Sequence, residues 1–122
     1  AGIVDLRRLG YLDGEPAVLQ HSRIGHATLG EFDAAALVKV SLYRYLAERR
    51  DIHVATVEET LEPHSADAGE AAHLGIAPGT AVFRSHRVAR DLVGAVIETS
   101  VNLIRGDMYR FTTRREGPGA AP

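Results

Sequence analysis

The sequence AVIETSVNLIRGDMYRF, residues 95–111, contains the pattern from which the fold can be worked out. Over residues 95–104 the side chains follow the two-residue period of a β-strand. One face is nearly all apolar and is expected to face a core; its members are Ala95, Ile97, Thr99, Val101 and Leu103. The other face carries Glu98, Ser100 and Asn102 between apolar ends. Three spaced polar groups are typical of the floor of a ligand site. An antiparallel strand with that face in water has the same pattern, so both interpretations stay open.

The composition is that of an ordinary globular domain. The chain has 122 residues, 45% of them hydrophobic and 25% charged, which is long enough for one core. Its formal net charge of -2 argues against nucleic-acid binding by this chain alone, because phosphate binding needs an excess of Lys and Arg. No cysteine is present, which excludes disulfides and a cysteine nucleophile. Without a transmembrane-length apolar run or a signal-peptide pattern, we expect a cytoplasmic protein.

The first half of the chain predicts a hairpin followed by a helix. Strands over 3–11 and 16–24 flank the turn signal Asp13-Gly14. The segment 25–40 is irregular, with a short helix around Phe32, Ala36 and Leu37. Ser41 is a suitable N-cap for a helix over 41–50.

The second half predicts a strand over 52–62 that ends at Pro63. Ser65 is expected to cap a short helix over 66–74, which ends at Gly75. Strands over 80–90 and 95–104 form a second hairpin. A further strand is expected over 108–115, followed by an unstructured tail over 116–122.

An internal repeat relates the two hairpins. AVLQHS at 17–22 is similar to AVIETS at 95–100, with Leu/Ile and Gln/Glu as close replacements. Each segment is the second strand of a predicted hairpin, and Arg8 and Arg87 lie in loosely equivalent places of the preceding strands. Two hairpins in equivalent places of one antiparallel sheet would put Gln20 and Glu98 on the same face, together with Ser22 and Ser100.

Two features could carry chemistry. A half-buried Glu98 needs a partner, for which Arg8, Arg87 or a ligand hydroxyl are candidates; a structural ion pair and a ligand contact are both open. The backbone N–H groups of Ser41, Leu42 and Tyr43 are donors at the positive end of a helix and could bind an anion, although every helix start has this property. The six histidines have neither the helical i, i+4 spacing nor the HExxH motif of zinc sites, so no metal and no cofactor is expected.

Four segments resemble one known family. They are RRLGYLDGEPAVLQHS at 7–22, VSLYRYLAER at 40–49, AGEAAHLGIAPGTAVFRSHRV at 68–88 and VIETSVNLIRGDMYRF at 96–111. Their order and content resemble the UTRA domain, the effector-binding domain of GntR-superfamily transcriptional regulators of the HutC type. The last segment is the most specific, because it follows the family's closing motif E-x-S-x-x-x-Y-R-G-D-x-Y-x-F.

The resemblance implies a chorismate-lyase-like α+β fold, an antiparallel sheet with small helical lobes, over residues 1–115. It also implies a homodimer, a small acidic or phosphorylated effector, no membrane partner, and DNA contacts made only by an N-terminal winged-helix domain that is absent from this chain. The abrupt start at Ala1 also suggests a fragment.

The family's anion-binding residues are carried over position by position. Arg8 matches the first-strand arginine, Gly10 replaces a second arginine, and Gln20 replaces a Glu, whereas Glu98 matches the family's second Glu. Ile104 replaces the tyrosine before Arg-Gly-Asp, which makes the pocket more apolar. The full expected effector site contains Arg8, Gln20, Ser22, Ser41, Leu42, Tyr43, Arg87, Glu98, Ser100 and Ile104.

The main interpretation is therefore a ligand-sensing, dimerising domain of a transcriptional regulator without catalysis. The alternative is a small chorismate-lyase-like enzyme acting on an acidic metabolite, because a fold does not determine a function. The sequence shows no acid–base pair or activated nucleophile that would favour the enzyme. A dimerisation module with a vestigial pocket is a third possibility.

Overall fold

The structure is a computed structural model that describes residues 2–117, with residues 38 and 39 described by their backbone only. The strands predicted over 3–11, 16–24, 80–90 and 95–104 are present, and the strand predicted over 52–62 lies at 56–65. The segment 25–40 contains two short helices rather than one. The elements are β1 (Ile3–Leu12), β2 (Glu15–Gly25), α1 (His26–Leu29), α2 (Ala34–Lys39), α3 (Leu42–Arg50), β3 (Thr56–Ser65), α4 (Ala68–Leu74), β4 (Ala81–Arg90) and β5 (Val96–Arg105). Of the expected tail, residues 118–122 lie outside the described part.

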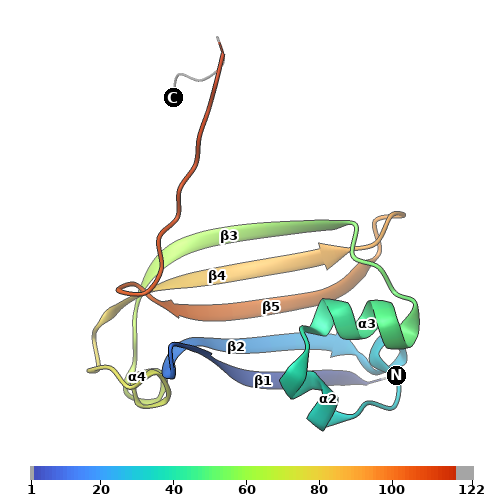
Figure 1. The fold of residues 1–122 in the computed structure, drawn as a ribbon, viewed down its shortest axis with the longest axis horizontal. Coiled ribbons are helices and arrows are strands. Elements are labelled where there is room, and N and C mark those ends of the chain that lie inside the picture. Colours follow the sequence, from blue (N-terminus) through green and yellow to red (C-terminus); the bar gives the residue numbers. More distant parts are fainter. Residues whose placement is uncertain (1, 118–122) are drawn as a thin grey trace.

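The strands form one antiparallel sheet in the order β1-β2-β5-β4-β3 (Figure 1). The turn between β1 and β2 has Asp13 and Gly14 at positive φ, as the Asp-Gly signal predicts. The second strands of both hairpins, β2 and β5, pair with each other at the centre of the sheet. The predicted α+β fold, an antiparallel sheet with small helical lobes, is confirmed.

The helices cover opposite faces of the sheet at opposite ends. Leu42, Tyr45 and Leu46 of α3 pack with Ile24 of β2 in one core cluster. Leu74 of α4 packs in a second cluster, whose sheet members are Leu9, Leu19, Val82 and Leu103. Ile24 and Leu19 are an odd number of residues apart on one strand, so their side chains point to opposite faces. In the described part of the chain, helices therefore cover each face at one end only.

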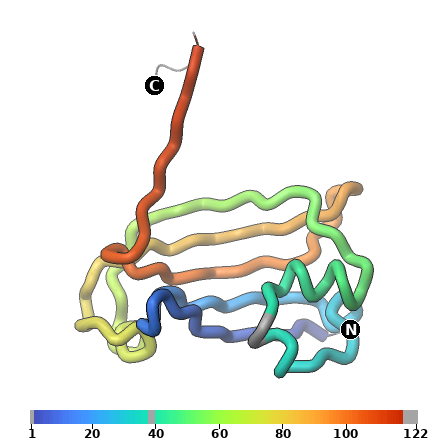
Figure 2. The backbone as a smooth tube through the Cα atoms, in the orientation of Figure 1, coloured from blue at the N-terminus to red at the C-terminus, as the bar shows by residue number. Residues whose placement is uncertain are grey.

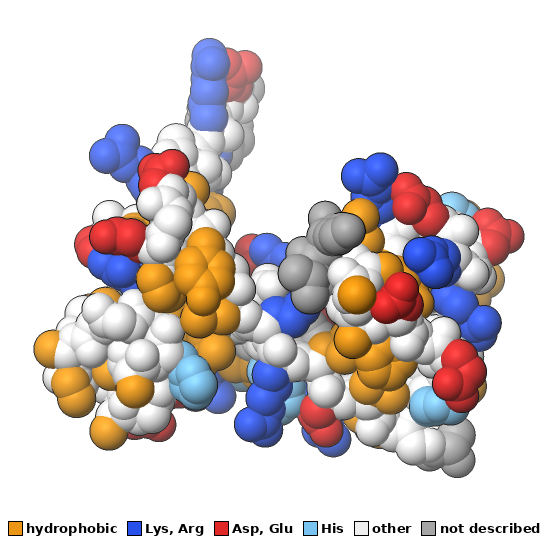
Figure 3. Space-filling model, turned by 60° about the horizontal axis from the view of Figure 1, so that its bottom comes forward, with side chains coloured by type: hydrophobic (Ala, Val, Ile, Leu, Met, Phe, Trp, Pro, Cys, Tyr) orange, Lys and Arg blue, Asp and Glu red, His pale blue; other side chains and the backbone are white. Residues whose placement is uncertain are grey.

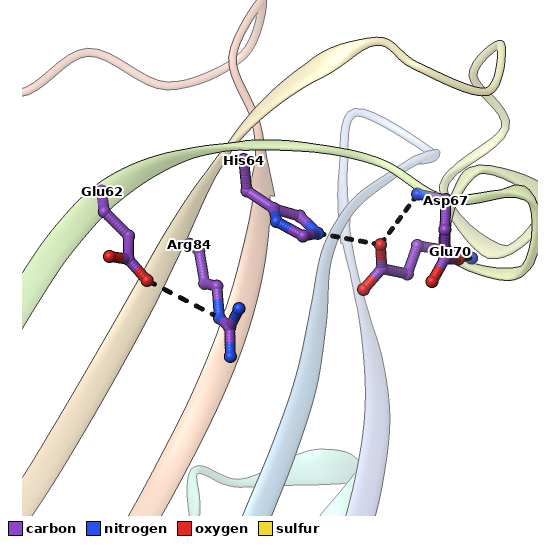
Figure 4. A network of polar contacts seen from close by, with 5 residues as sticks. All are labelled: Glu62, His64, Asp67, Glu70 and Arg84. Carbon is purple, nitrogen blue, oxygen red and sulfur yellow. Dashed lines mark hydrogen bonds and ion pairs between the residues drawn. The ribbon is translucent and has the colours of Figure 1, made fainter.

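A polar network fastens α4 to the edge of the sheet (Figure 4). The Nε2 of His64 on β3 lies 3.0 Å from Oε1 of Glu70 on α4. The same Glu70 oxygen accepts a hydrogen bond from the backbone N–H of Asp67 at 2.9 Å. The Asp67 carboxylate accepts in return from the Glu70 N–H at 2.8 Å, which completes a capping box.

Two predicted boundaries near α4 are wrong. β3 does not end at Pro63 but continues to Ser65, because β3 is an edge strand on which a missing N–H is tolerated. The N-cap of α4 is Asp67 rather than Ser65. The reason is that Asp67 and Glu70 have the spacing of a capping box, which satisfies two backbone donors at once.

The expected strand over 108–115 is not formed. The backbone N–H of Met108 still donates a hydrogen bond to the Arg105 carbonyl at 3.2 Å. Tyr109 packs edge-on against Phe83, with ring centroids 5.3 Å apart. Beyond these contacts the backbone leaves the sheet and runs away from it (Figure 2). Arg105 lies opposite Val82, and β4 begins at Ala81, so a continuation of β5 over 108–115 has no residue of β4 opposite it.

The assignment of the two faces of β5 is also wrong. The expected core face contains Thr99, which is exposed, and Val101, which is only half-buried. The buried face is instead the polar one, where Glu98, Ser100 and Asn102 are 4%, 7% and 4% exposed. The cause is that α1–α3 pack over this polar face, whereas no helix covers Thr99 in the described part of the chain.

A local irregularity adds to this difference. Ala89 lies opposite Glu98, but Arg90 lies opposite Val96, so Ile97 has no opposite residue on β4. Ile97 and Glu98 are therefore both buried although they are neighbours, and Ile97 joins the cluster under α3.

Candidate functional site

The candidate site lies at the centre of the sheet, where the two related hairpins meet. Ser22 of β2 is directly opposite Ser100 of β5, and Gln20 is opposite Asn102. Two residues before Ser100, Glu98 points to the same face. The expectation that Gln20, Ser22, Glu98 and Ser100 share one face is therefore confirmed. The loose equivalence of the two arginines is not, because Arg8 is opposite Gln20 whereas Arg87 is opposite Ser100.

These side chains line one cavity of about 170 Å³ between the sheet and the start of α3. Nine of the ten residues expected in the effector site line it. The lining consists of Arg8, Gln20, Ser22, Ser41, Leu42, Tyr43, Arg87, Glu98, Ser100 and Asn102. Seen from this side, the surface is hollowed between the two ends of the molecule, with Lys or Arg side chains along the hollow (Figure 3).

Two residues separate the expected site from the observed cavity. Ile104 does not line the cavity but lies on the same face two residues beyond Asn102, opposite Val18 and Phe83. Asn102 was not expected as a site residue, yet it is 4% exposed and its Nδ2 donates to Ser100 Oγ at 3.1 Å. Its place as the third polar residue in the row Glu98, Ser100, Asn102 was the signal for it.

Arg8 provides an unused positive group in the cavity. Its Nε is buried, and no hydrogen-bond partner for it exists among the described residues. A buried guanidinium donor without an acceptor is energetically unfavourable, so such a group usually binds something outside the chain. Arginine also presents its donors in a planar fork that fits carboxylates and phosphates.

Glu98 is bound by the helical lobe rather than by an arginine. The Tyr43 hydroxyl donates to Glu98 Oε1 at 2.9 Å, so neither Arg8 nor Arg87 is the partner that makes a hydrogen bond to it. Burial of the phenol, followed by the charge of Glu98, raises the pKa of Tyr43 to about 12. This bond joins residues 55 positions apart and links α3 to the centre of the sheet.

Arg87 is already paired on the far side of the cavity. Its Nε donates to Glu59 Oε2 at 2.7 Å, and the same oxygen accepts from Ser85 Oγ at 2.6 Å. The hydrogen bond from Ser85, together with that from Arg87, lowers the pKa of Glu59. Arg87 therefore supplies a positive field at the cavity while its Nε is occupied, in contrast to Arg8.

The start of α3 forms the wall opposite the sheet. Ser41 is the N-cap as predicted, and its Oγ accepts from the Arg44 N–H at 3.2 Å. The first-turn N–H groups of Leu42 and Tyr43 have no partner within a helix, as in every first turn. The cavity thus combines donors from Arg8 and the helix start with one carboxylate acceptor, Glu98, and amide and hydroxyl groups between them. This arrangement suits a ligand with an anionic group and hydroxyl or amine donors.

Residues 2–117 contain no group of three or more His, Cys, Asp or Glu side chains that could hold a metal ion. Within the same residues, none of the helices has the length and apolarity that a membrane crossing requires.

Comparisons with known proteins identify the family and agree with the fold. A family model described as the UTRA domain matches residues 1–110. A ligand-binding domain from Bordetella bronchiseptica, assigned to a GntR-family transcriptional regulator, has a TM-score of 0.85 at 18% identity over 93% of this chain and 73% of its own. A GntR-family transcriptional regulator from Enterococcus faecalis has a TM-score of 0.82 at 18% identity over 93% of this chain and 81% of its own.

A third similar structure is PhnF from Mycobacterium smegmatis, with a TM-score of 0.80 and 27% identity. The match covers 93% of this chain but 50% of PhnF, so the chain spans about half the length of that relative. The family model covers most of the chain, including all but the last residue of the closing motif that begins at Glu98. The chain belongs to the UTRA domain family.

Proposed function

We propose that the central cavity binds a small acidic or phosphorylated metabolite as the effector of a GntR-type regulator of the HutC type. The observation that carries the proposal is the buried Nε of Arg8, which has no hydrogen-bond partner among the described residues and lines the same cavity as the first turn of α3. Arg8 is suited to bind an anion by its formal positive charge, and the first turn of α3 by its N–H groups and the helix dipole. Glu98 would bind a hydroxyl or amine of the same ligand.

The hydrogen bond between Tyr43 and Glu98 suggests how binding is transmitted. A ligand that donates to Oε1 of Glu98 competes with the Tyr43 hydroxyl, which donates to the same oxygen at 2.9 Å and so links α3 to the sheet. A ligand that also contacts the start of α3 would favour a different position of the helical lobe. Such a shift between two positions requires only that the ligand binds one more tightly than the other.

The wider assembly is part of this proposal. We expect the domain to act as a homodimer in the cytoplasm, with DNA bound by an N-terminal winged-helix domain. A change in the helical lobes would then alter the spacing of two DNA-binding domains. Native mass spectrometry of the purified chain would report the dimer and any ligand that co-purifies with it.

Inorganic phosphate is a direct probe of the anion site. Calorimetry should detect binding to the wild-type chain, at least tenfold weaker binding to Arg8→Gln, and binding within twofold of wild type for Arg23→Gln. Arg23 is the matched control because it is exposed on the opposite face of β2. Equal affinities for the Arg8 and Arg23 variants would contradict the proposal.

Glu98→Ala tests the other half of the site. We expect it to abolish binding of a co-purified effector while the fold is kept, because the Tyr43 hydroxyl can still reach water in its half-buried position. Retained effector affinity in a folded variant would show that Glu98 is not a ligand contact. Turnover of chorismate by the chain would instead support the enzyme alternative.

A further inference from the structure

We infer that the effector is an amphipathic acid, with an apolar part that extends from the polar site along β1 and β2 toward Gly10, Val18 and Ile104. The inference rests on the proposed function, since it concerns the ligand of the same cavity. It follows from three features of the chain: the sequence of rows across the sheet, the size of the cavity, and the space left by Gly10.

The strand register arranges the site face in rows whose character changes abruptly. The row through Ser22 and Ser100 and the row through Gln20 and Asn102 are polar at their centre. The next row is apolar throughout and consists of Gly10, Val18, Ile104, Phe83 and Pro63. A ligand lying along the strands would therefore contact polar groups first and an apolar floor immediately after them.

A second cavity adjoins the site on this apolar side. It measures about 370 Å³ and shares Arg8 and Gln20 with the site cavity. The other described residues that line it are Arg7, Leu9, Gly10, Leu37 and Val40, so the described side chains contributed by α2 and the residue after it are apolar. The site cavity alone, at about 170 Å³, is smaller than the roughly 300–1,000 Å³ of typical small-molecule pockets. The two together reach that range.

Gly10 keeps this passage open. The residue has an ordinary φ, and a Cβ built on it would meet only Val18, at 3.6 Å from its Cβ and 3.7 Å from its carbonyl oxygen. The backbone therefore does not require glycine at this position, and a side chain would be tolerated there. What a side chain would remove is the space between β1 and the apolar wall of α2.

The position of Arg8 determines the direction in which the ligand lies. Arg8 belongs to the polar row with Gln20 and lines both cavities, so its guanidinium stands where the polar and apolar regions meet. A carboxylate held by Arg8 would leave its hydrocarbon part over Gly10 and Ile104. A compact sugar phosphate would fill the polar cavity and leave the apolar one to water.

The test is a series of straight-chain carboxylates, butanoate, hexanoate and octanoate, titrated into the full chain by calorimetry. Each methylene that is fully buried tightens binding about fourfold, from about 0.8 kcal/mol per methylene. Because Ile104 and Val18 are only half-buried, we expect octanoate to bind at least tenfold more tightly than butanoate.

Matched variants separate the two parts of the site. Gly10→Leu fills the adjoining cavity and should bring octanoate within threefold of butanoate without weakening butanoate. Ile104→Ser makes the floor polar without adding volume and should also weaken octanoate selectively. Thr99→Leu adds the same leucine to the exposed face of β5 and should leave the series unchanged.

The outcomes distinguish this inference from the proposed function. If the acids bind through Arg8 but chain length has no effect, the apolar extension is wrong and the anion site stands. If no acid binds and Arg8→Gln changes nothing, the proposed function fails and the inference fails with it. Chain-length dependence that survives both Arg8→Gln and Gly10→Leu would place the acids elsewhere and would also overturn the inference.

Discussion

Replacing Tyr43 by Phe removes the one hydroxyl that joins the helical lobe to Glu98. A hydrogen bond to a charged group contributes about 1.5–3 kcal/mol to stability. Tyr43 is only half-buried, so water can replace part of this bond, and we expect the lower end of that range, about 1.5 kcal/mol. For a domain of this size the loss should lower Tm by about 4–6 °C. Urea denaturation and thermal unfolding of the two proteins measure it.

The pH dependence gives the same prediction a second, independent check. Because the pKa of Tyr43 is raised to about 12 from its ordinary value near 10, the folded state keeps a proton that the unfolded chain releases in this interval. The stabilisation is complete below pH 10 and is lost as the pH rises toward 12. The pKa difference alone corresponds to about 2.7 kcal/mol in the free energy of unfolding, and the partial exposure of Tyr43 reduces this contribution to about 1.5 kcal/mol.

The control for both measurements is Tyr11→Phe. Tyr11 is 62% exposed, and its replacement should not change the free energy of unfolding. In an absorbance titration of the wild type, the Tyr43 phenol should ionise late, and Tyr43→Phe should remove that late step. The reasoning is refuted if Tyr43→Phe is as stable as Tyr11→Phe at pH 7 and still shows the late ionisation step of the wild type.

Two further predictions concern the ends of the sheet and are checked by urea denaturation. Asp67→Ala breaks the capping box of α4 and should cost about 1 kcal/mol, whereas Ser65→Ala, at the position outside the helix, should cost nothing measurable; equal losses would show that the cap is not at Asp67. Leu46→Ala empties a fully buried position under α3 and should cost about 2–5 kcal/mol, whereas Leu92→Ala, at 92% exposure, should stay within about 0.5 kcal/mol of wild type. A small loss at Leu46 would mean that α3 is not packed as described.

Much of the fold could be predicted because its signals are local. The Asp13-Gly14 turn, the existence of strand β5 and the Ser41 cap each depend on a few neighbouring residues, and all are present in the structure. The repeat of AVLQHS in AVIETS extended these signals to two equivalent hairpins in one antiparallel sheet. The same repeat placed Gln20 and Glu98 on one face of the sheet.

What could not be predicted depends on contacts between distant segments. Pro63 stops a central strand but not an edge strand, and the edge position of β3 is known only from the strand order. Thr99 was placed in the core because its face is more apolar, yet the helical lobe packs on the polar face. The partner of Glu98, Tyr43, lies 55 positions away in a helix. Asp67 is different, because its capping-box spacing to Glu70 was present in the sequence and was overlooked.

The central claim is that Arg8 receives an anion in the cavity, and NMR of the arginine side chains tests it most directly. In a ¹⁵N-labelled chain, the Nε–Hε signal of Arg8 is assigned by its absence in Arg8→Gln, and inorganic phosphate is then titrated. The account predicts a saturable shift of this signal, because its Nε is buried without a partner among the described residues, and no comparable shift for Arg23. A stationary Arg8 signal, or equal shifts for Arg8 and Arg23, would contradict it.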